Sequence, residues 1–178
     1  MKGLYGASPD VAGLVLIHIA GLATGVAAML MLPTDEELGF ASRVIFFALA
    51  VDVGGGVVAN GTRSTNDWYA TQPLKLSYLF LVVHIIQPVL LSLVVGVSWS
   101  TSAFLYLYQL VAGGLVLGIR RPDLQKPMAA GLLTLGVLLY FVFFLPSPAL
   151  SWIGVLYLIK LVMMFPVDHY AGLKSRQR

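Results

Sequence analysis

The sequence predicts an all-α integral membrane protein in which residues 1–178 form one bundle of six transmembrane helices. Of the 178 residues, 58% are hydrophobic and only 11% are charged, whereas soluble domains average about 25% charged residues. The mean hydropathy is +0.88. Long apolar stretches fill most of the chain, and the basic residues fall on alternate connections between them. Together these features predict a polytopic protein with both termini in the cytoplasm.

Each predicted span is a stretch long enough to cross a bilayer, which requires about 20 mostly apolar residues. The spans are Val11–Leu32, Phe40–Asn60, Leu76–Val97, Ser102–Ile119, Met128–Leu145 and Leu150–Val167. Alternation of polar and apolar residues is absent, so helices are favoured over a transmembrane barrel. The fifth stretch carries only Thr134 and Tyr140 as polar groups in its interior. We therefore expect it to be the most lipid-facing helix.

The positions of Lys and Arg predict the orientation, because these residues concentrate on cytoplasmic loops. With both termini inside, Arg43 alone lies outside and Lys160 lies within a span. The remaining basic residues all fall on the cytoplasmic side: Lys2, Arg63, Lys75, Arg120, Arg121, Lys126, Lys174, Arg176 and Arg178. The pattern predicts a multi-pass protein of the plasma (cell inner) membrane, with the lipid bilayer as its surroundings. The net charge of +3 then reflects topology, and nucleic acid is not an expected partner.

Cysteine and glycine content narrows the chemistry further. The chain has no cysteine, which excludes disulfides, thiolate catalysis and cysteine-ligated metal centres. The runs Gly54–Gly56 and Gly113–Gly114 follow no strand, so they do not fit a phosphate-binding loop. Small residues allow membrane helices to approach closely, and we interpret these runs as packing surfaces.

Polar side chains recur at one depth of the predicted bundle. His18, Asp52, His84, Gln109 and Lys160 lie on five different spans, each several residues from the cytoplasmic end. At about 1.5 Å per residue this depth is roughly 12 to 17 Å. Ionisable groups within a membrane are costly and usually face the bundle interior or a cavity. We therefore predict a polar intramembrane site at this level.

Helical spacing extends the predicted site. Gln87 shares a helix face with His84, and Asn60 and Arg63 continue the stripe that begins at Asp52. The predicted ligand-binding residues are His18, Asp52, His84, Gln87, Gln109, Lys160, Asn60 and Arg63.

Pro88 predicts a backbone irregularity at the same level. Proline lacks an N–H, so the carbonyl four residues earlier, that of His84, loses its helical hydrogen bond. We expect a kink there, with a free acceptor that a side chain, water or ligand satisfies.

These residues favour the binding or translocation of a small polar solute or ion in a cavity open to the cytoplasm. Asp52 would be the coupling carboxylate, and His18 and His84 would be relay or ligand groups, because their side chains can titrate when buried. In length and helix count the chain is similar to the vitamin-uptake substrate-binding subunits of energy-coupling transporters, which would imply a transport role.

Two other classes remain open. The first is an intramembrane enzyme acting on a lipid or isoprenoid, with His18, Asp52 and His84 as an alternative metal site or the two histidines as axial haem ligands. The first span, with Gly21 and Gly25 after His18, resembles a haem-binding or copper-resistance-type membrane helix. The second is an accessory subunit that contacts other membrane subunits, in which Asp52 and Lys160 form a structural ion pair. No cofactor follows from the residues alone.

Overall fold

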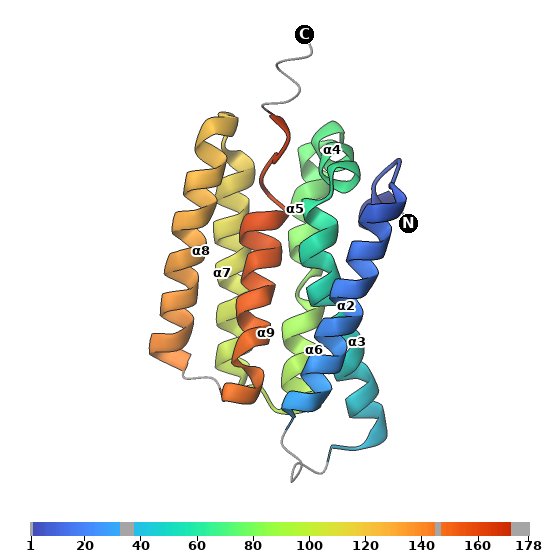
Figure 1. Cartoon of the computed structure of the whole chain (residues 1–178). Helices are drawn as coiled ribbons and strands as arrows, with labels where there is room; N and C mark the ends of the chain where they lie inside the picture. Colours follow the sequence, from blue (N-terminus) through green and yellow to red (C-terminus); the bar gives the residue numbers. More distant parts are fainter. Residues whose placement is uncertain (1, 33–37, 145–146, 172–178) are drawn as a thin grey trace.

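The computed structural model describes residues 2–32, 38–144 and 147–171, and the secondary structure of these residues is helical without strands (Figure 1). The elements are α1 (Lys2–Tyr5), α2 (Val11–Met31), α3 (Phe40–Gly61), α4 (Arg63–Thr71), α5 (Leu74–Val83), α6 (Ile86–Val95), α7 (Trp99–Gly118), α8 (Pro122–Phe144), α9 (Pro148–Leu158) and the π-helix η1 (Ile159–Met164). The long helices run side by side along one axis, which confirms the all-helical prediction.

Five of the described helices are long and apolar enough to cross a membrane. They are α2, α3, the combined α5–α6 segment Leu74–Val95, α7 and α8. The protein is accordingly a multi-pass membrane protein by the length and composition of its helices. α8 is the least buried of the five and α3 the most buried. The low burial of α8 agrees with the expectation that the fifth predicted span faces lipid most.

The sixth predicted span, Leu150–Val167, is shorter in the structure. Its apolar helical part covers Leu150–Met164, below the length of the other spans. Pro166 explains the earlier end, because proline has no N–H to continue the helical hydrogen bonds; Phe165 before it is the C-cap of η1. α9 and η1 contact α3, α7 and α8, so the segment occupies the interior of the bundle (Figure 1).

Two helix starts also differ from the sequence prediction. α7 begins at Trp99 because Ser98 is its N-cap, and the Ser98 side chain accepts from the Thr101 N–H. α8 begins at Pro122, where a proline suits the first turn of a helix. The predicted span started only at Met128 because the polar residues of this first turn lower its hydropathy.

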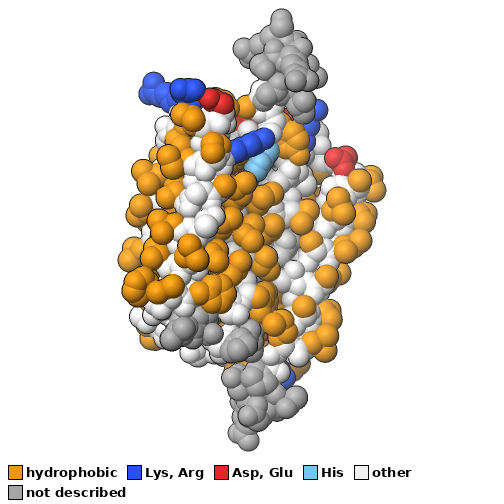
Figure 2. All heavy atoms as spheres, turned by 60° about the vertical axis from the view of Figure 1, so that its left-hand side comes forward, with side chains coloured by type: hydrophobic (Ala, Val, Ile, Leu, Met, Phe, Trp, Pro, Cys, Tyr) orange, Lys and Arg blue, Asp and Glu red, His pale blue; other side chains and the backbone are white. Residues whose placement is uncertain are grey.

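The two ends of the bundle differ in charge. α1, α4 and residues 165–171 lie at one end, and the turns at 61–63 and 119–122 lie there too (Figure 1). Charged side chains gather at this end, while hydrophobic side chains cover the middle of the bundle (Figure 2). Arg43 lies near the start of α3, at the opposite end. Lys174, Arg176 and Arg178 lie outside the described residues.

Glycines bring α2 and α3 into close contact, as the sequence predicts for its small residues. A Cβ added at Gly21 would lie 3.0 Å from the Val51 carbonyl oxygen, and one added at Gly55 would lie 3.3 Å from that of Ile17. At Gly113 of α7, an added Cβ would lie 2.7 Å from the Leu161 carbonyl oxygen of η1. The glycine runs are therefore packing surfaces.

The helix interruption predicted from Pro88 is present. α5 ends at Val83 and α6 begins at Ile86, with a turn at His84–Ile85 between them. The Tyr157 hydroxyl of α9 donates to the freed His84 carbonyl at 2.9 Å. The Ser102 hydroxyl of α7 donates to the Pro88 carbonyl at 2.8 Å. The Tyr157 side chain thus replaces the backbone donor that Pro88 lacks, and Ser102 joins α7 to α6 beside it.

Replacing Tyr157 with Phe tests this replacement. The change removes the donor from a buried carbonyl, and leaving such a group unpaired costs about 1–3 kcal/mol. Hydrogen bonds between membrane helices contribute at the low end of this range, so we expect the unfolding free energy to fall by about 1–2 kcal/mol. The measurement is the unfolding free energy of the purified protein in mixed micelles titrated with a denaturing detergent.

Tyr106→Phe is the matched control, because the Tyr106 hydroxyl donates to the Val82 carbonyl at 3.3 Å at an exposed position. We expect it to change stability by less than half as much. Equal losses in the two variants would show that the kink does not depend on Tyr157.

Candidate functional site: an ion pair on an intramembrane cavity

The centre of the candidate site is an ion pair between α3 and η1. The ammonium of Lys160 lies 2.8 Å from Oδ2 of Asp52, and it also donates to the Asp52 carbonyl oxygen at 3.3 Å. The Lys160 side chain is only 3% exposed, whereas that of Asp52 is 43% exposed. The cation is therefore enclosed by the bundle, and the anion faces open space.

The π-helix positions Lys160. In η1 the Phe165 N–H donates to the Lys160 carbonyl, a bond that spans five residues instead of four. The Asn60 side-chain amide of α3 donates to the same carbonyl at 3.4 Å. The Lys160 carbonyl thus accepts two hydrogen bonds, and the one from Asn60 joins η1 to the end of α3.

Gly56 provides the space for the lysine side chain. It lies one helical turn after Asp52, and an added Cβ would lie 2.7 Å from Nζ and 3.0 Å from Cδ of Lys160. Any larger residue would occupy the volume through which the ammonium reaches the carboxylate. This is the position in the Gly54–Gly56 run at which a glycine is required for the ion pair.

Gln87 and His84 complete the polar wall next to the pair. The Gln87 amide donates to Oδ2 of Asp52 at 2.6 Å. Its Oε1 is buried and has no hydrogen-bond partner among the described residues. Nδ1 of His84 lies 2.5 Å from the Phe80 carbonyl oxygen, so it carries the hydrogen and donates. In the uncharged ring, Nε2 is then an acceptor.

A cavity of about 640 Å³ opens beside these residues, between α3 and the kinked α5–α6 segment. Asp52, Asn60, His84, Gln87 and Lys160 all line it. Its other walls are mostly apolar, and several of their residues also lie on the outer surface of the bundle: Val44 and Ile45 of α3 are 49% and 37% exposed, and Val83 and Ile86 are 45% and 58% exposed. The cavity therefore opens sideways, toward the position of the lipid.

Three predicted site residues lie away from this wall. Gln109 is fully buried and its amide donates to the Leu81 carbonyl at 3.1 Å, which joins α7 to α5. Arg63 pairs with Asp67 on α4 at 3.3 Å. It leaves the Asp52 stripe because α3 ends at Gly61 and Thr62 is extended. His18 lines a second cavity, described next.

The second cavity lies between α2 and α3 and has a volume of about 450 Å³. His18 lines it together with Tyr5, and Asp52 lines both cavities. Nδ1 of His18 lies 2.7 Å from the Leu14 carbonyl, and its ring stacks on Tyr5 with centroids 5.8 Å apart. His18 and His84 thus lie at different cavities. Among the described residues, no three His, Asp or Glu side chains form a group that could hold a metal ion.

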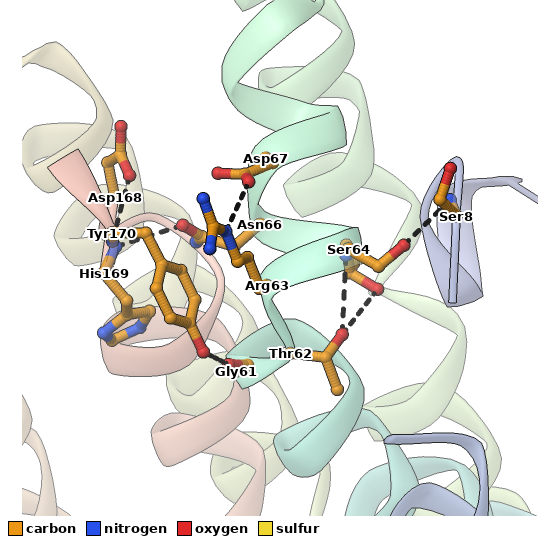
Figure 3. A network of polar contacts seen from close by, with 11 residues as sticks. Ser8, Gly61, Thr62, Arg63, Ser64, Asn66, Asp67, Asp168, His169 and Tyr170 are labelled. Carbon is orange, nitrogen blue, oxygen red and sulfur yellow. Dashed lines mark hydrogen bonds and ion pairs between the residues drawn. The ribbon is translucent and has the colours of Figure 1, made fainter. Parts of the chain in front are cut away.

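A polar network lies at the end of the bundle that holds α4 (Figure 3). The Asn66 side chain donates to the Val167 carbonyl at 2.7 Å and accepts from the His169 N–H at 3.1 Å. The Tyr170 hydroxyl donates to the Gly61 carbonyl at 2.9 Å. These bonds fasten the segment after η1 to the corner between α3 and α4.

Burial alters the titration of two side chains at this end. It lowers the pKa of His169 from its usual value, so the imidazole is held uncharged. It raises the pKa of Tyr69 to about 12. Tyr69 packs edge-on against Phe165 with ring centroids 4.9 Å apart, and it lines the end of the larger cavity. The cavity is therefore bounded at this end by a neutral phenol.

Comparison of the chain with protein-family models, with curated proteins and with solved structures gives no match. Function is therefore inferred from the geometry of the described residues.

Replacing Gly56 with Ala tests the geometry of the ion pair. The new methyl group would displace the Lys160 side chain, and forced displacement in a packed interior costs about 1–3 kcal/mol. We expect a lower unfolding free energy by that amount, measured in mixed micelles. Gly114→Ala is the control, because an added Cβ there lies at an ordinary 3.5 Å from Tyr78. That change should leave stability equal or raise it by up to about 1 kcal/mol, and a Gly56→Ala variant as stable as Gly114→Ala would contradict the assignment.

Proposed function

We propose that the protein binds a small molecule or ion in the larger cavity, as the binding step of uptake or translocation, with Asp52 as the main contact. One observation carries the proposal: the anion of a mid-helix ion pair lies open to a cavity while its cation is enclosed. An ion pair that served packing alone would be expected to bury both partners. Here one carboxylate oxygen is held by Lys160 and Gln87, and the other has no partner among the described residues.

The energetics of buried charges support a functional role. Desolvation of two charges offsets most of their attraction, and apolar replacements of buried ion pairs are often neutral or stabilising. Ionisable groups within membrane segments usually belong to a pathway or binding site. The cavity volume falls within the range of about 300–1,000 Å³ that is typical of ligand sites.

We also propose the orientation predicted by the basic residues, with six spans across the plasma (cell inner) membrane and both termini in the cytoplasm. Gly3, Asn60 and Tyr69 line the cavity at the end that holds α1 and α4. In this orientation the cavity reaches toward the cytoplasmic side, and Asp52 lies deeper in the bilayer.

Ligand binding is tested by filling the cavity. Ala48 lines the cavity next to Asp52, so Ala48→Trp should exclude a ligand without changing the ion pair. We expect native mass spectrometry of the wild-type protein, released from mild detergent, to show a bound small molecule that the variant lacks. Ala130→Trp on the exposed face of α8 is the control and should keep the ligand. A wild-type protein that carries no ligand, or equal occupancy in both variants, would count against the proposal.

The orientation is tested by single cysteines, since the chain has none of its own. Thr71 at the end of α4 and Ser100 at the start of α7 are both exposed and lie at opposite ends. In intact cells, a membrane-impermeant maleimide should label Ser100→Cys and not Thr71→Cys, and permeabilisation should make both reactive. Labelling of Thr71→Cys in intact cells would reverse the proposed topology.

A further inference from the structure

We infer that the ligand of the larger cavity is a neutral amphiphile that enters from the bilayer and whose head group donates at least two hydrogen bonds to Asp52 and Gln87. This inference rests on the proposed function and names the ligand class for the same cavity.

The polar atoms left without partners at the cavity wall are acceptors. Both contacts of the Lys160 ammonium go to Asp52, and the Gln87 amide N–H₂ is also directed to the Asp52 carboxylate. Oδ1 of Asp52 has no partner among the described residues, and Oε1 of Gln87 is buried without one. A buried acceptor without a donor costs about 1–3 kcal/mol. A head group that donates to both atoms would recover this cost at Gln87 and add a hydrogen bond to the open oxygen of Asp52.

The charge of the wall favours an uncharged head group. The carboxylate of Asp52 is neutralised by Lys160 at 2.8 Å, so no net charge remains for an ionic ligand to balance. A cationic head group would meet the Lys160 ammonium, and an anionic one would meet the free carboxylate oxygen. Charges brought into a low-dielectric site without a partner are costly. Hydroxyl or amide N–H groups satisfy the acceptors without that cost.

The remaining walls match an apolar chain. Val44, Ile45 and Leu49 of α3 face Val83, Ile86 and Leu90 of α5–α6 across the cavity. Val44, Ile45, Val83 and Ile86 are also exposed on the outer surface, so the cavity joins the lipid-facing side of the bundle. An alkyl chain lying there gains apolar contact on one side, while its head group reaches Asp52 within the same cavity.

The test compares probes that share a dodecyl chain and differ in the head group. The first probe is a diol with hydroxyl groups on the first two carbons at one end of the chain, and the second is the dimethyl ether of this diol. The other two probes are dodecylammonium and dodecanoate. Binding to the full-length protein in nanodiscs is measured by native mass spectrometry and by the shift in thermal unfolding. We expect the diol to bind at least about tenfold more tightly than the ether, since the ether cannot donate, and more tightly than both ions.

Two variants localise the effect. Gln87→Leu removes one acceptor and leaves the ion pair, and it should reduce diol affinity about fivefold or more while leaving ether binding unchanged. Ala48→Trp should abolish binding of the diol, which separates cavity binding from dissolution in the bilayer. Tighter binding of either ion, or equal binding of diol and ether, overturns the inference and leaves the proposed function standing. Absence of binding by every probe, together with a wild-type protein that carries no native ligand, overturns both.

Discussion

The attraction between Lys160 and Asp52 across a low-dielectric interior is the interaction on which the site depends. Each charge alone would be costly at this depth, and removing one partner of a buried pair typically costs about 3–5 kcal/mol. The pair therefore fixes the distance between α3 and η1. Three neighbouring residues support the pair. Gly56 leaves space for the Lys160 ammonium, Asn60 donates to the Lys160 carbonyl, and Gln87 donates to the Asp52 carboxylate. Because the pair covers only one side of Asp52, the carboxylate also lines the cavity.

Two irregularities of the backbone flank this pair. The His84–Ile85 turn before Pro88 separates α5 from α6, and the π-helix widens the last turn of the C-terminal span. At each irregularity a carbonyl receives a side-chain donor from another helix: Tyr157 donates to the freed His84 carbonyl, and Asn60 donates to the Lys160 carbonyl, which also accepts from the Phe165 N–H. Irregular backbone is tolerated within a membrane where the protein itself supplies the donors. Both irregularities lie at the depth of the polar side chains.

Much of this arrangement could be predicted from the sequence. Hydropathy predicts the long helices, Pro88 predicts the kink, and the common depth of polar residues selects Asp52, His84 and Lys160. Helical spacing adds Gln87, and all four residues line one cavity. Depth alone could not show which way a side chain points. Gln109 shares the depth but bonds to the Leu81 carbonyl, and His18 faces a different cavity. Arg63 fits the helical stripe only if α3 continues, and Thr62 ends it.

The π-helix also has a consequence for register. One residue corresponds to about 100° of rotation about an α-helix axis, so the extra residue in η1 turns everything after it relative to α9. Without that residue, a helix that directed Tyr157 toward His84 would direct the segment from Val167 to Tyr170 away from Asn66 and Gly61. A single inserted residue thus allows one short helix to point in two directions. Tyr157 points toward the His84 carbonyl at the kink, and the segment from Val167 to Tyr170 lies against the corner between α3 and α4.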